Sequence, residues 1–229
     1  ALTMADNLVT TRLAIKEVAM EHNIYATFMP KPLEQHDGSG LHLHLSLFKG
    51  DTNAFYDETQ PDNLSDIAKS FMAGLIRHGS EITAVTNQWV NSYKRLVTGF
   101  DAPIFSTWDR TNQAAVVRVP NIGKNRPGAT RIEYRAPDPA CNPYLASSLI
   151  LAAGLTGIEK GYKLRDDTPA ERLPATLSEA LDVMESSALV KDTLGEHVFE
   201  WFLRNKRREW QRYEHHVSRF ELEQYLPVL

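Results

Sequence analysis

The sequence predicts an α+β fold, in which strands and helices mix without strict alternation. Two segments, residues 41–48 and 130–136, alternate apolar and polar side chains with the two-residue period of a half-buried strand. Helical patterns several turns long precede and follow these two segments. The 229 residues are enough to form a substantial hydrophobic core.

The first forty residues are predicted to form a helix, a short strand and a turn. An amphipathic helix is expected over residues 5–21, because apolar residues recur there at helical spacing. The segment 24–29, IYATFM, predicts a short strand that ends at Pro30, since proline has no amide hydrogen to donate to a strand ladder. A polar turn follows at residues 34–40, where two glycines permit sharp backbone geometry.

The segment 41–48, LHLHLSLF, is the clearest strand of the sequence. Leucines occupy its odd positions and share one face, because strand side chains point alternately to opposite sides. The other face carries His42, His44 and Ser46. In the second alternating segment, 130–136, one face carries Arg131, Glu133 and Arg135. Each of the two strands is therefore predicted to present a row of polar groups.

The rest of the chain is predicted to be mainly helical. Residues 86–106 are irregular and rich in polar and aromatic side chains, and a loop of that length within a compact domain is usually functional. The segment 144–161 is apolar almost all round, which indicates a buried helix. The other expected elements are a strand at 114–120 and helices at about 64–83, 177–189 and 192–214.

Composition and charge exclude several classes of protein. Apolar residues make up 42% and charged residues 24% of the chain, as in ordinary globular proteins. The net charge of −4 argues against nucleic acid as a partner, and the basic segment 204–212 is flanked by acidic residues, so a solvated helix face is expected there. No apolar run reaches the roughly 18 residues of a membrane span. The single cysteine, Cys141, permits no intrachain disulfide, which predicts a reducing, cytoplasmic compartment.

The two polar rows indicate a metal site. A carboxylate held between two arginines has a lowered pKa and stays ionised, so Glu133 is a candidate ligand. A neutral imidazole from His42 would complete a pair of donors that Mn²⁺ or Mg²⁺ accepts. The alternative is a sheet edge that faces water. Metal-dependent hydrolases also use an H-x-H motif, but they need further ligands, and the remaining histidines are expected at the surface or in structural roles: His22, His36, His78, His197, His215 and His216.

Four arginines lie in or beside segments that are not helical: Arg95, Arg118, Arg131 and Arg135. Guanidinium groups match the geometry of carboxylates and phosphates, so such a cluster is typical of a site that binds a nucleotide and a carboxylate substrate. Positioned cations also stabilise a phosphoryl group during its transfer. The alternative is a set of ordinary salt bridges with Asp101, Asp109 and Asp138.

Six motifs occur in order along the chain: FMPKP, GSGLHLHLS, NSYKRL, GFDAP, VVRVP and RIEYRAPDPACNPYLA. Together they resemble the C-terminal catalytic domain of bacterial-type glutamine synthetase, and the segment from residue 194 onward resembles the actinobacterial type. The resemblance implies that residues 1–229 form a glutamine synthetase/guanido kinase-like catalytic domain, with an antiparallel sheet flanked by helices. It also implies that an N-terminal β-grasp domain and the first catalytic strands, which carry the family's remaining glutamate ligands, lie outside this chain.

The resemblance also implies an ATP-dependent ligase that joins ammonia to the γ-carboxylate of L-glutamate through a γ-glutamyl phosphate. Mg²⁺ or Mn²⁺ is the implied cofactor, and the full-length protein is implied to be a dodecamer of two hexameric rings. The chain alone is expected to be inactive. The implied metal ligands are His42 and Glu133. The residues implied to lie at ATP are His44, Ser46, Arg118 and Arg131. Those at the substrate are Asp37, Gly38, Arg95, Gln113 and Arg135, and the catalytic residues are Asp101 and Arg135.

Three departures from the family pattern bear on the reaction. The flap motif, usually GYEAP, is GFDAP here, so the side chain of Asp101 is one methylene shorter than the glutamate it replaces. The NRS motif becomes NQA, so Gln113 stands in place of an arginine that faces phosphate. The adenylylation tyrosine motif of regulated enterobacterial enzymes is not visible between residues 162 and 177. Two alternatives stay open: a γ-glutamyl ligase that uses a polyamine or another amine, and a non-catalytic relative that binds nucleotide.

Overall fold

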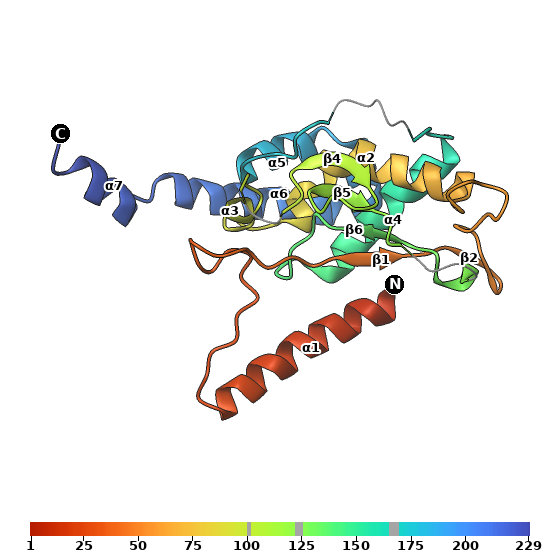
Figure 1. Ribbon diagram of the computed structural model, residues 1–229. Helices are drawn as coiled ribbons and strands as arrows, with labels where there is room; N and C mark the ends of the chain where they lie inside the picture. The colour runs from red at the N-terminus through yellow and green to blue at the C-terminus, as the bar shows by residue number, and fades with distance from the viewer. Residues whose placement is uncertain (100–101, 122–125, 165–169) are drawn as a thin grey trace.

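The computed structural model describes residues 1–99, 102–121, 126–164 and 170–229, and within these ranges the fold is α+β, as predicted (Figure 1). Helices pack against a four-stranded sheet whose strand order is β1-β6-β5-β4. Its strands are β1 (Leu43–Leu45), β4 (Phe105–Asp109), β5 (Ala115–Arg118) and β6 (Ile132–Tyr134). A separate small sheet pairs β2 (Phe48–Lys49) with β3 (Thr52–Asn53).

The direction of the strands agrees with the prediction at the centre of the main sheet and differs at one edge. Strand β6 pairs antiparallel with β1 on one side and with β5 on the other. Strand β4 runs parallel to β5, so the predicted antiparallel sheet includes one parallel pair at this edge. The residues of β4, FSTWD, mix polar and aromatic side chains without the alternation that would have predicted a strand, and they begin within the segment expected to be irregular.

Most of the helices begin at a side chain that accepts a hydrogen bond from the first turn. The capped helices are α2 (Asp66–Thr86), α4 (Pro143–Glu159), α5 (Leu177–Glu185), α6 (Ala188–Glu214) and α7 (Arg219–Tyr225), with the caps Ser65, Asn142, Thr176, Ser187 and Ser218. Helix α1 (Leu2–Glu21) and the single turn α3 (Ser92–Arg95) begin without a side-chain cap. None of the helices in the described ranges is long and apolar enough to cross a membrane.

The predicted helices are present, with some different boundaries. The segment expected as one helix at 177–189 is split, because α5 ends at Glu185 and α6 begins at Ala188. Gly195 has a φ of 73°, a left-handed conformation that glycine adopts easily, and it bends α6 near its start. The expected strand at 24–29 is wrong, since this segment pairs with none of the described strands. Helix α7 was not predicted.

The core is built where α2 crosses α4 and packs on the sheet. Gly74 on α2 and Gly154 and Gly157 on α4 let the two helices approach closely. A Cβ atom on Gly157 would lie 2.2 Å from the carbonyl oxygen of Ser70. A Cβ atom on Gly154 would lie 2.2 Å from the ring of Phe71. Helix α2 also contacts β4 and β5, so it connects the helical layer to the half of the sheet that includes Arg118 on β5.

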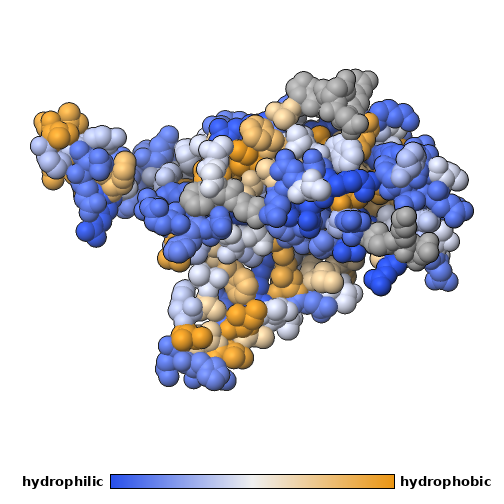
Figure 2. All heavy atoms as spheres, viewed as in Figure 1, coloured by the Kyte–Doolittle hydropathy of each residue, from blue (hydrophilic) through white to orange (hydrophobic). Residues whose placement is uncertain are grey.

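Helix α1 lies beside the body of the protein and contacts it sparsely (Figure 1). The hydroxyl of Tyr144 donates a hydrogen bond to Asp6 at 2.7 Å, and Arg12 donates from Nη1 to the carbonyl oxygen of Cys141 at 3.0 Å. Only two of its residues, Ala5 and Ala19, are buried. Several large apolar side chains of this helix are exposed, among them Leu13 and Val18. Figure 2 shows apolar surface on the lower part of the molecule.

We predict that Gly157→Ala lowers the free energy of unfolding by about 1–3 kcal/mol, because the new methyl group meets main-chain atoms of α2 that cannot move separately. The higher helix propensity of alanine, worth about 1 kcal/mol, would offset only part of this loss. Urea unfolding measures the change. Gly128→Ala is the matched control, since a Cβ atom there meets nothing within 4 Å. Equal stability of the two variants would contradict the prediction.

Candidate functional site

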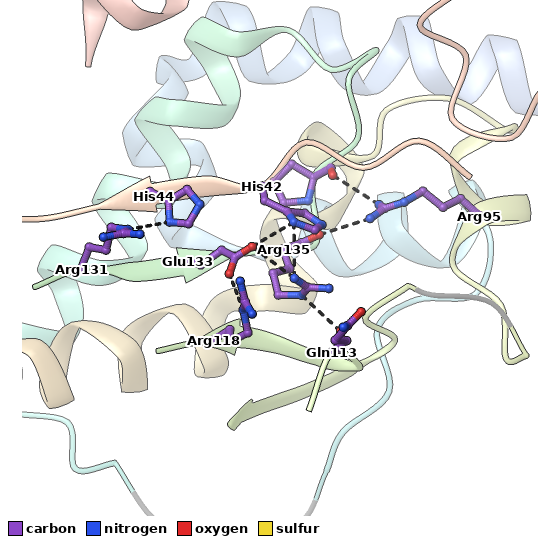
Figure 3. A network of polar contacts seen from close by, with 9 residues as sticks. His42, His44, Arg95, Gln113, Arg118, Arg131, Glu133 and Arg135 are labelled. Atoms are coloured by element: carbon purple, nitrogen blue, oxygen red, sulfur yellow. Dashed lines mark hydrogen bonds and ion pairs between the residues drawn. The ribbon is translucent and has the colours of Figure 1, made fainter. Parts of the chain in front are cut away.

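Three neighbouring strands place polar side chains on one face of the main sheet. Glu133 on β6 is the direct partner of His44 on β1 and of Arg118 on β5, so the three residues form a row across the strands. Residues two apart along a strand share a face, which adds His42 and Arg135 to the same side. Figure 3 shows these side chains gathered together. The two rows predicted on separate strands therefore form one cluster.

The carboxylate of Glu133 is the centre of this cluster. Its side chain is 2% exposed, and Oε1 lies 2.9 Å from Nδ1 of His42 and 3.2 Å from Nη1 of Arg135. Its other oxygen, Oε2, accepts a hydrogen bond from Nε of Arg118 at 2.5 Å. Burial alone would raise the pKa of Glu133, but the hydrogen bond and charge of Arg118, followed by the charges of Arg135 and His42, lower it below the ordinary value. Glu133 is therefore ionised. Of the two arginines on its own strand that the sequence placed beside it, Arg135 contacts the carboxylate, whereas Arg131 contacts His44 and Arg118 supplies the second guanidinium.

The imidazole of His42 is neutral at neutral pH. Burial lowers its pKa, the positive charge of Arg135 lowers it further, and the opposing effect of Glu133 is smaller. A neutral ring that donates from Nδ1 to Glu133 keeps a lone pair on Nε2, which is the arrangement in which a carboxylate orients a metal-binding histidine. In this arrangement Glu133 can itself be a metal ligand, or it can orient the imidazole of His42 as the metal ligand.

The imidazole of His44 belongs to a second contact at the edge of the cluster. Its Nδ1 accepts a hydrogen bond from Nε of Arg131 at 3.2 Å, and burial is the main cause that lowers its pKa. Nearby, the hydroxyl of Ser46 donates to the carbonyl oxygen of Thr130 at 2.9 Å. Three of the residues implied to lie at ATP, His44, Ser46 and Arg131, are thus close to the turn that precedes β6. Ser46 holds the main chain of that turn.

Arg95 and Arg135 are connected through main-chain carbonyl groups. Arg95 is 2% exposed, and it donates from Nη1 to the carbonyl oxygen of Ala136 at 2.8 Å and from Nη2 to that of Arg135 at 3.3 Å. Arg135 donates from Nε to the carbonyl oxygen of Gln113 at 3.2 Å. The arginine implied to hold the substrate carboxylate is therefore buried against the turn that follows β6. Gln113 lies beside the arginine implied to contact the reacting end of the substrate (Figure 3).

The turn at residues 34–40 lies against the side chain of Arg95. A Cβ atom on Gly38 would lie 2.8 Å from Cγ of Arg95, and one on Gly40 would lie 2.6 Å from its Nη2. These two positions therefore exclude any larger side chain while the arginine stays in place. Asp37 is exposed and directly precedes Gly38. The predicted turn and its glycines are thus brought to the same end of the cluster as Arg95.

The alternative role considered for the arginines was a set of salt bridges with Asp101, Asp109 and Asp138. The carboxylate that binds Arg118 and Arg135 is Glu133. Asp109 accepts hydrogen bonds within its own turn, from the amides of Thr111 and Asn112. The carboxylate of Asp138 accepts hydrogen bonds from Asn87 at 3.2 Å and from the amide of Ala140 at 3.0 Å, and burial raises its pKa. Asp101 lies outside the described residues.

The remaining histidines have the positions that the sequence predicted. His78 is buried in α2, where its Nδ1 lies 2.7 Å from a carboxylate oxygen of Glu81. The other five lie at the surface: His22, His36, His197, His215 and His216. Among the described residues, no group of three histidine, cysteine, aspartate or glutamate side chains is placed to hold a metal ion. His42 and Glu133 together provide the kinds of donor that suit Mg²⁺ or Mn²⁺, and two ligands are one corner of such a site.

One buried residue that shapes the site left no signal in the sequence. Asn53, at the end of β3, is 5% exposed and donates from Nδ2 to the carbonyl oxygens of Pro127 at 3.0 Å and Thr130 at 2.7 Å. It therefore fixes the turn that leads into Arg131. Asn53 lies in a stretch of ordinary loop composition, GDTNAF, so only the folded arrangement reveals its contact with a turn more than seventy residues away.

A family model described as "Glutamine synthetase, catalytic domain" matches residues 1–225. The chain belongs to the glutamine synthetase family. The glutamine synthetase of Mycolicibacterium smegmatis is 52% identical over 243 aligned residues, and that of Mycobacterium tuberculosis is 53% identical. Each alignment covers the whole of this chain and 54% of the relative. The chain thus spans about half the length of the curated glutamine synthetases that it matches.

Solved structures of similar proteins agree with the fold. A solved structure described as "GmaS/ADP complex-Conformation 1" has a TM-score of 0.87 and 35% identity, and the match covers 97% of this chain and 54% of that one. Plasmodium falciparum glutamine synthetase has a TM-score of 0.89 and 28% identity, covering 98% of this chain and 54% of that one. The fold class and the family resemblance predicted from the sequence are therefore confirmed.

We predict that Glu133→Gln lowers the free energy of unfolding by about 3 kcal/mol or more at pH 7, because it removes the carboxylate that neutralises two guanidinium groups. In the folded protein the pKa of Glu133 lies below the reference value of 4.5. Its stabilisation is therefore complete above that pH and is lost as the pH falls through the lower, folded-state pKa. The variant is expected to lose less stability than the parent on acidification.

Urea unfolding of both proteins at pH 7 and at several lower pH values measures this difference. Glu58→Gln, at an exposed position, is the matched control and should change the free energy of unfolding at pH 7 by less than about 0.5 kcal/mol. A Glu133→Gln variant as stable as the parent at pH 7 would contradict the prediction.

Proposed function

We propose that this chain provides the catalytic domain of an ATP-dependent ligase that joins ammonia to the γ-carboxylate of L-glutamate. The observation that carries the proposal is the cluster on one sheet face, where an ionised Glu133 lies among Arg118, Arg135 and a neutral His42. Such a cluster suits a reaction in which negative charge builds up on a phosphoryl group. Membership of the family and the ADP complex of the structural neighbour support the nucleotide as co-substrate.

The proposed roles follow the two ends of the cluster. At the nucleotide end, the turn held by Ser46 and Asn53 presents Arg131, which contacts His44. Arg118 is also assigned to this end. Arg118 and Arg131 are proposed to bind phosphate oxygens. His44 and Ser46 are proposed to lie beside the nucleotide.

At the substrate end, the turn at 34–40 and Gln113 surround Arg95 and Arg135. Asp37, Gly38, Arg95, Gln113 and Arg135 are proposed to bind glutamate. Arg135 is also proposed to contact its reacting end, and Asp101, outside the described residues, to assist the incoming amine.

The reaction is proposed to run in two steps. The γ-carboxylate of glutamate attacks the terminal phosphorus of ATP, forming a γ-glutamyl phosphate and releasing ADP. Ammonia then attacks the acyl carbon, phosphate leaves, and a proton passes from the nitrogen to a base. Mg²⁺ or Mn²⁺ held by His42 and Glu133 would supply charge neutralisation at the phosphate oxygens. Arg118, Arg131 and Arg135 supply fixed positive charge, and they need little reorganisation because their partners already hold them.

We include in the proposal a cytoplasmic location and assembly of the full-length protein into two hexameric rings. The assembly is proposed from membership of the family, and the location from the single cysteine of the sequence. Rings of identical subunits use heterologous contacts that close on themselves.

The proposal predicts phosphate release by the full-length protein that depends on ATP, glutamate, ammonium and Mg²⁺ together. His42→Ala is expected to lower kcat/KM by about 100-fold, because it removes a ligand and the partner that helps orient Glu133. It should also weaken Mn²⁺ binding, measured by titration. The exposed His36→Ala is the control and should match the parent. The absence of phosphate release with ammonium and with every amine in a panel would refute the proposal.

One observation favours a second candidate, a γ-glutamyl ligase that uses a larger amine. Gln113 stands where the family pattern has an arginine, and its main chain is held against Arg135 (Figure 3). A neutral side chain at this position reduces the positive charge near the reacting end of the substrate. A smaller positive field there would repel less strongly an amine acceptor that carries a second ammonium group.

We predict that Gln113→Arg lowers kcat/KM for a diamine by about tenfold relative to ammonium, through repulsion between the new guanidinium and the distal ammonium group. Phosphate release with ammonium, methylamine and a diamine measures the ratio. An unchanged ratio would contradict the amine-specific role. Activity that appears with ammonium only in the variant would instead support the non-catalytic relative considered from the sequence.

A further inference from the structure

A buried lysine on α6 takes no part in the proposed chemistry. Lys206 is 4% exposed, and its ammonium group lies 3.7 Å from the centre of the Trp89 ring. Its Nζ also lies 2.8 Å from a carboxylate oxygen of Glu209, one turn further along the same helix. Burying a lysine is unfavourable unless its charge is compensated, and here one carboxylate and one aromatic face compensate it. The cation is thus held between α6 and the loop that contains Trp89.

The same group of residues contacts the loop at two further points. The other carboxylate oxygen of Glu209 accepts a hydrogen bond from the amide of Val90 at 3.4 Å. The indole Nε1 of Trp89 donates to the carbonyl oxygen of Ala140 at 2.9 Å. We call Lys206, Glu209 and Trp89 the clasp. It joins the C-terminal half of α6 to the loop at 88–91 and to the turn before α4.

The clasped loop leads directly to the substrate end of the proposed site. The amide of Trp89 donates to the hydroxyl of Ser92, the first residue of α3, and α3 ends at Arg95. The side chain of Asn91 forms two hydrogen bonds with the main chain of Lys31, at 2.8 and 3.0 Å. Lys31 begins the segment that runs to the turn at 34–40. The clasp is therefore connected to both segments that surround the guanidinium of Arg95.

The clasp has no comparable connection to the nucleotide end among the described contacts. The turn before β6 is held by Ser46 and Asn53 through Thr130 and Pro127. Ser46 directly follows β1, Asn53 ends β3, and Pro127 and Thr130 belong to the turn itself. Loosening the clasp should therefore disturb one end of the site and spare the other.

We propose that Lys206, Glu209 and Trp89 are positioning residues that set the affinity for the glutamate substrate by holding the Arg95 loop. The expected effect on the affinity for glutamate rests on the proposed function. The expected effect on the position of the loop rests on the contacts alone. The cation acts through Trp89 and Val90, and it touches neither substrate nor nucleotide. A loss of the clasp lets the loop at 88–91 and the segment from Lys31 move relative to β6.

Lys206→Met keeps the length and packing of the side chain but removes its charge, so it isolates the interaction with Trp89 and Glu209. In the full-length protein we expect KM for glutamate to rise about tenfold, because small displacements of a binding group are costly. KM for ATP should change by less than about twofold, since the turn at 127–131 has separate anchors. Lys206→Arg keeps the cation over the ring and should restore KM for glutamate to within about threefold of the parent.

Arg204→Met is the matched control on the same helix. Arg204 lies over the ring of Trp201 at 4.8 Å, and both residues of this pair are exposed. This variant should leave both KM values unchanged. An unchanged KM for glutamate in Lys206→Met, or an equal rise in the KM values for glutamate and ATP, would overturn the proposal.

Hydrogen exchange tests the clasp independently of catalysis. In Lys206→Met the amides of residues 89–96 and of Lys31 should exchange at least about fivefold faster than in the parent, because local opening becomes easier. Those of 127–134 should exchange as before. If the amides of residues 89–96 exchange at the same rate in Lys206→Met as in the parent, the proposed role of the clasp is wrong, even if the enzyme is active. If the parent releases no phosphate, the proposed function fails, and the exchange measurement still decides whether the clasp holds the loop.

Discussion

The ionised carboxylate of Glu133 is the group on which the rest of the site depends. It is almost completely buried, and a buried charge is tolerated only when other charges and hydrogen bonds replace the water it has lost. Arg118, Arg135 and His42 provide that replacement from three directions. The same contacts keep the two guanidinium groups close together. The imidazole stays neutral because burial and the charge of Arg135 lower its pKa against the opposing effect of Glu133.

The fold achieves this arrangement by pairing strands that are distant in sequence. His42 and Arg135 are 93 positions apart, yet the register of β1 against β6 brings them to the same face. The close crossing of α2 and α4 supports the sheet, because their glycines let α2 lie deep enough to contact β4 and β5. The site thus has two ends that different segments hold, the turn before β6 at one end and the loop leading to Arg95 at the other.

Much of this arrangement could be predicted from the sequence, because it depends on local patterns. The alternation in LHLHLSLF and TRIEYRA placed His42, His44, Glu133 and the arginines on polar faces, and the order of the motifs predicted the family. Contacts between distant segments left no such pattern. The parallel edge strand β4, the anchoring by Asn53 and the burial of Lys206 each depend on which segments meet, and a single sequence does not record that. The strand expected at 24–29 was wrong because an extended sequence still needs a partner.

The anchoring of Arg95 and Arg135 through carbonyl oxygens has a consequence for how such a protein can diverge. Arg95 donates to the main chain of residues 135–137, and Arg135 donates to the main chain of Gln113. Every amino acid offers the same carbonyl oxygen, so these anchors survive a substitution at the accepting position as long as the backbone keeps its path. Evolution can therefore exchange the side chains that surround the arginines, and with them the molecules that are admitted, without dismantling the cationic framework beneath.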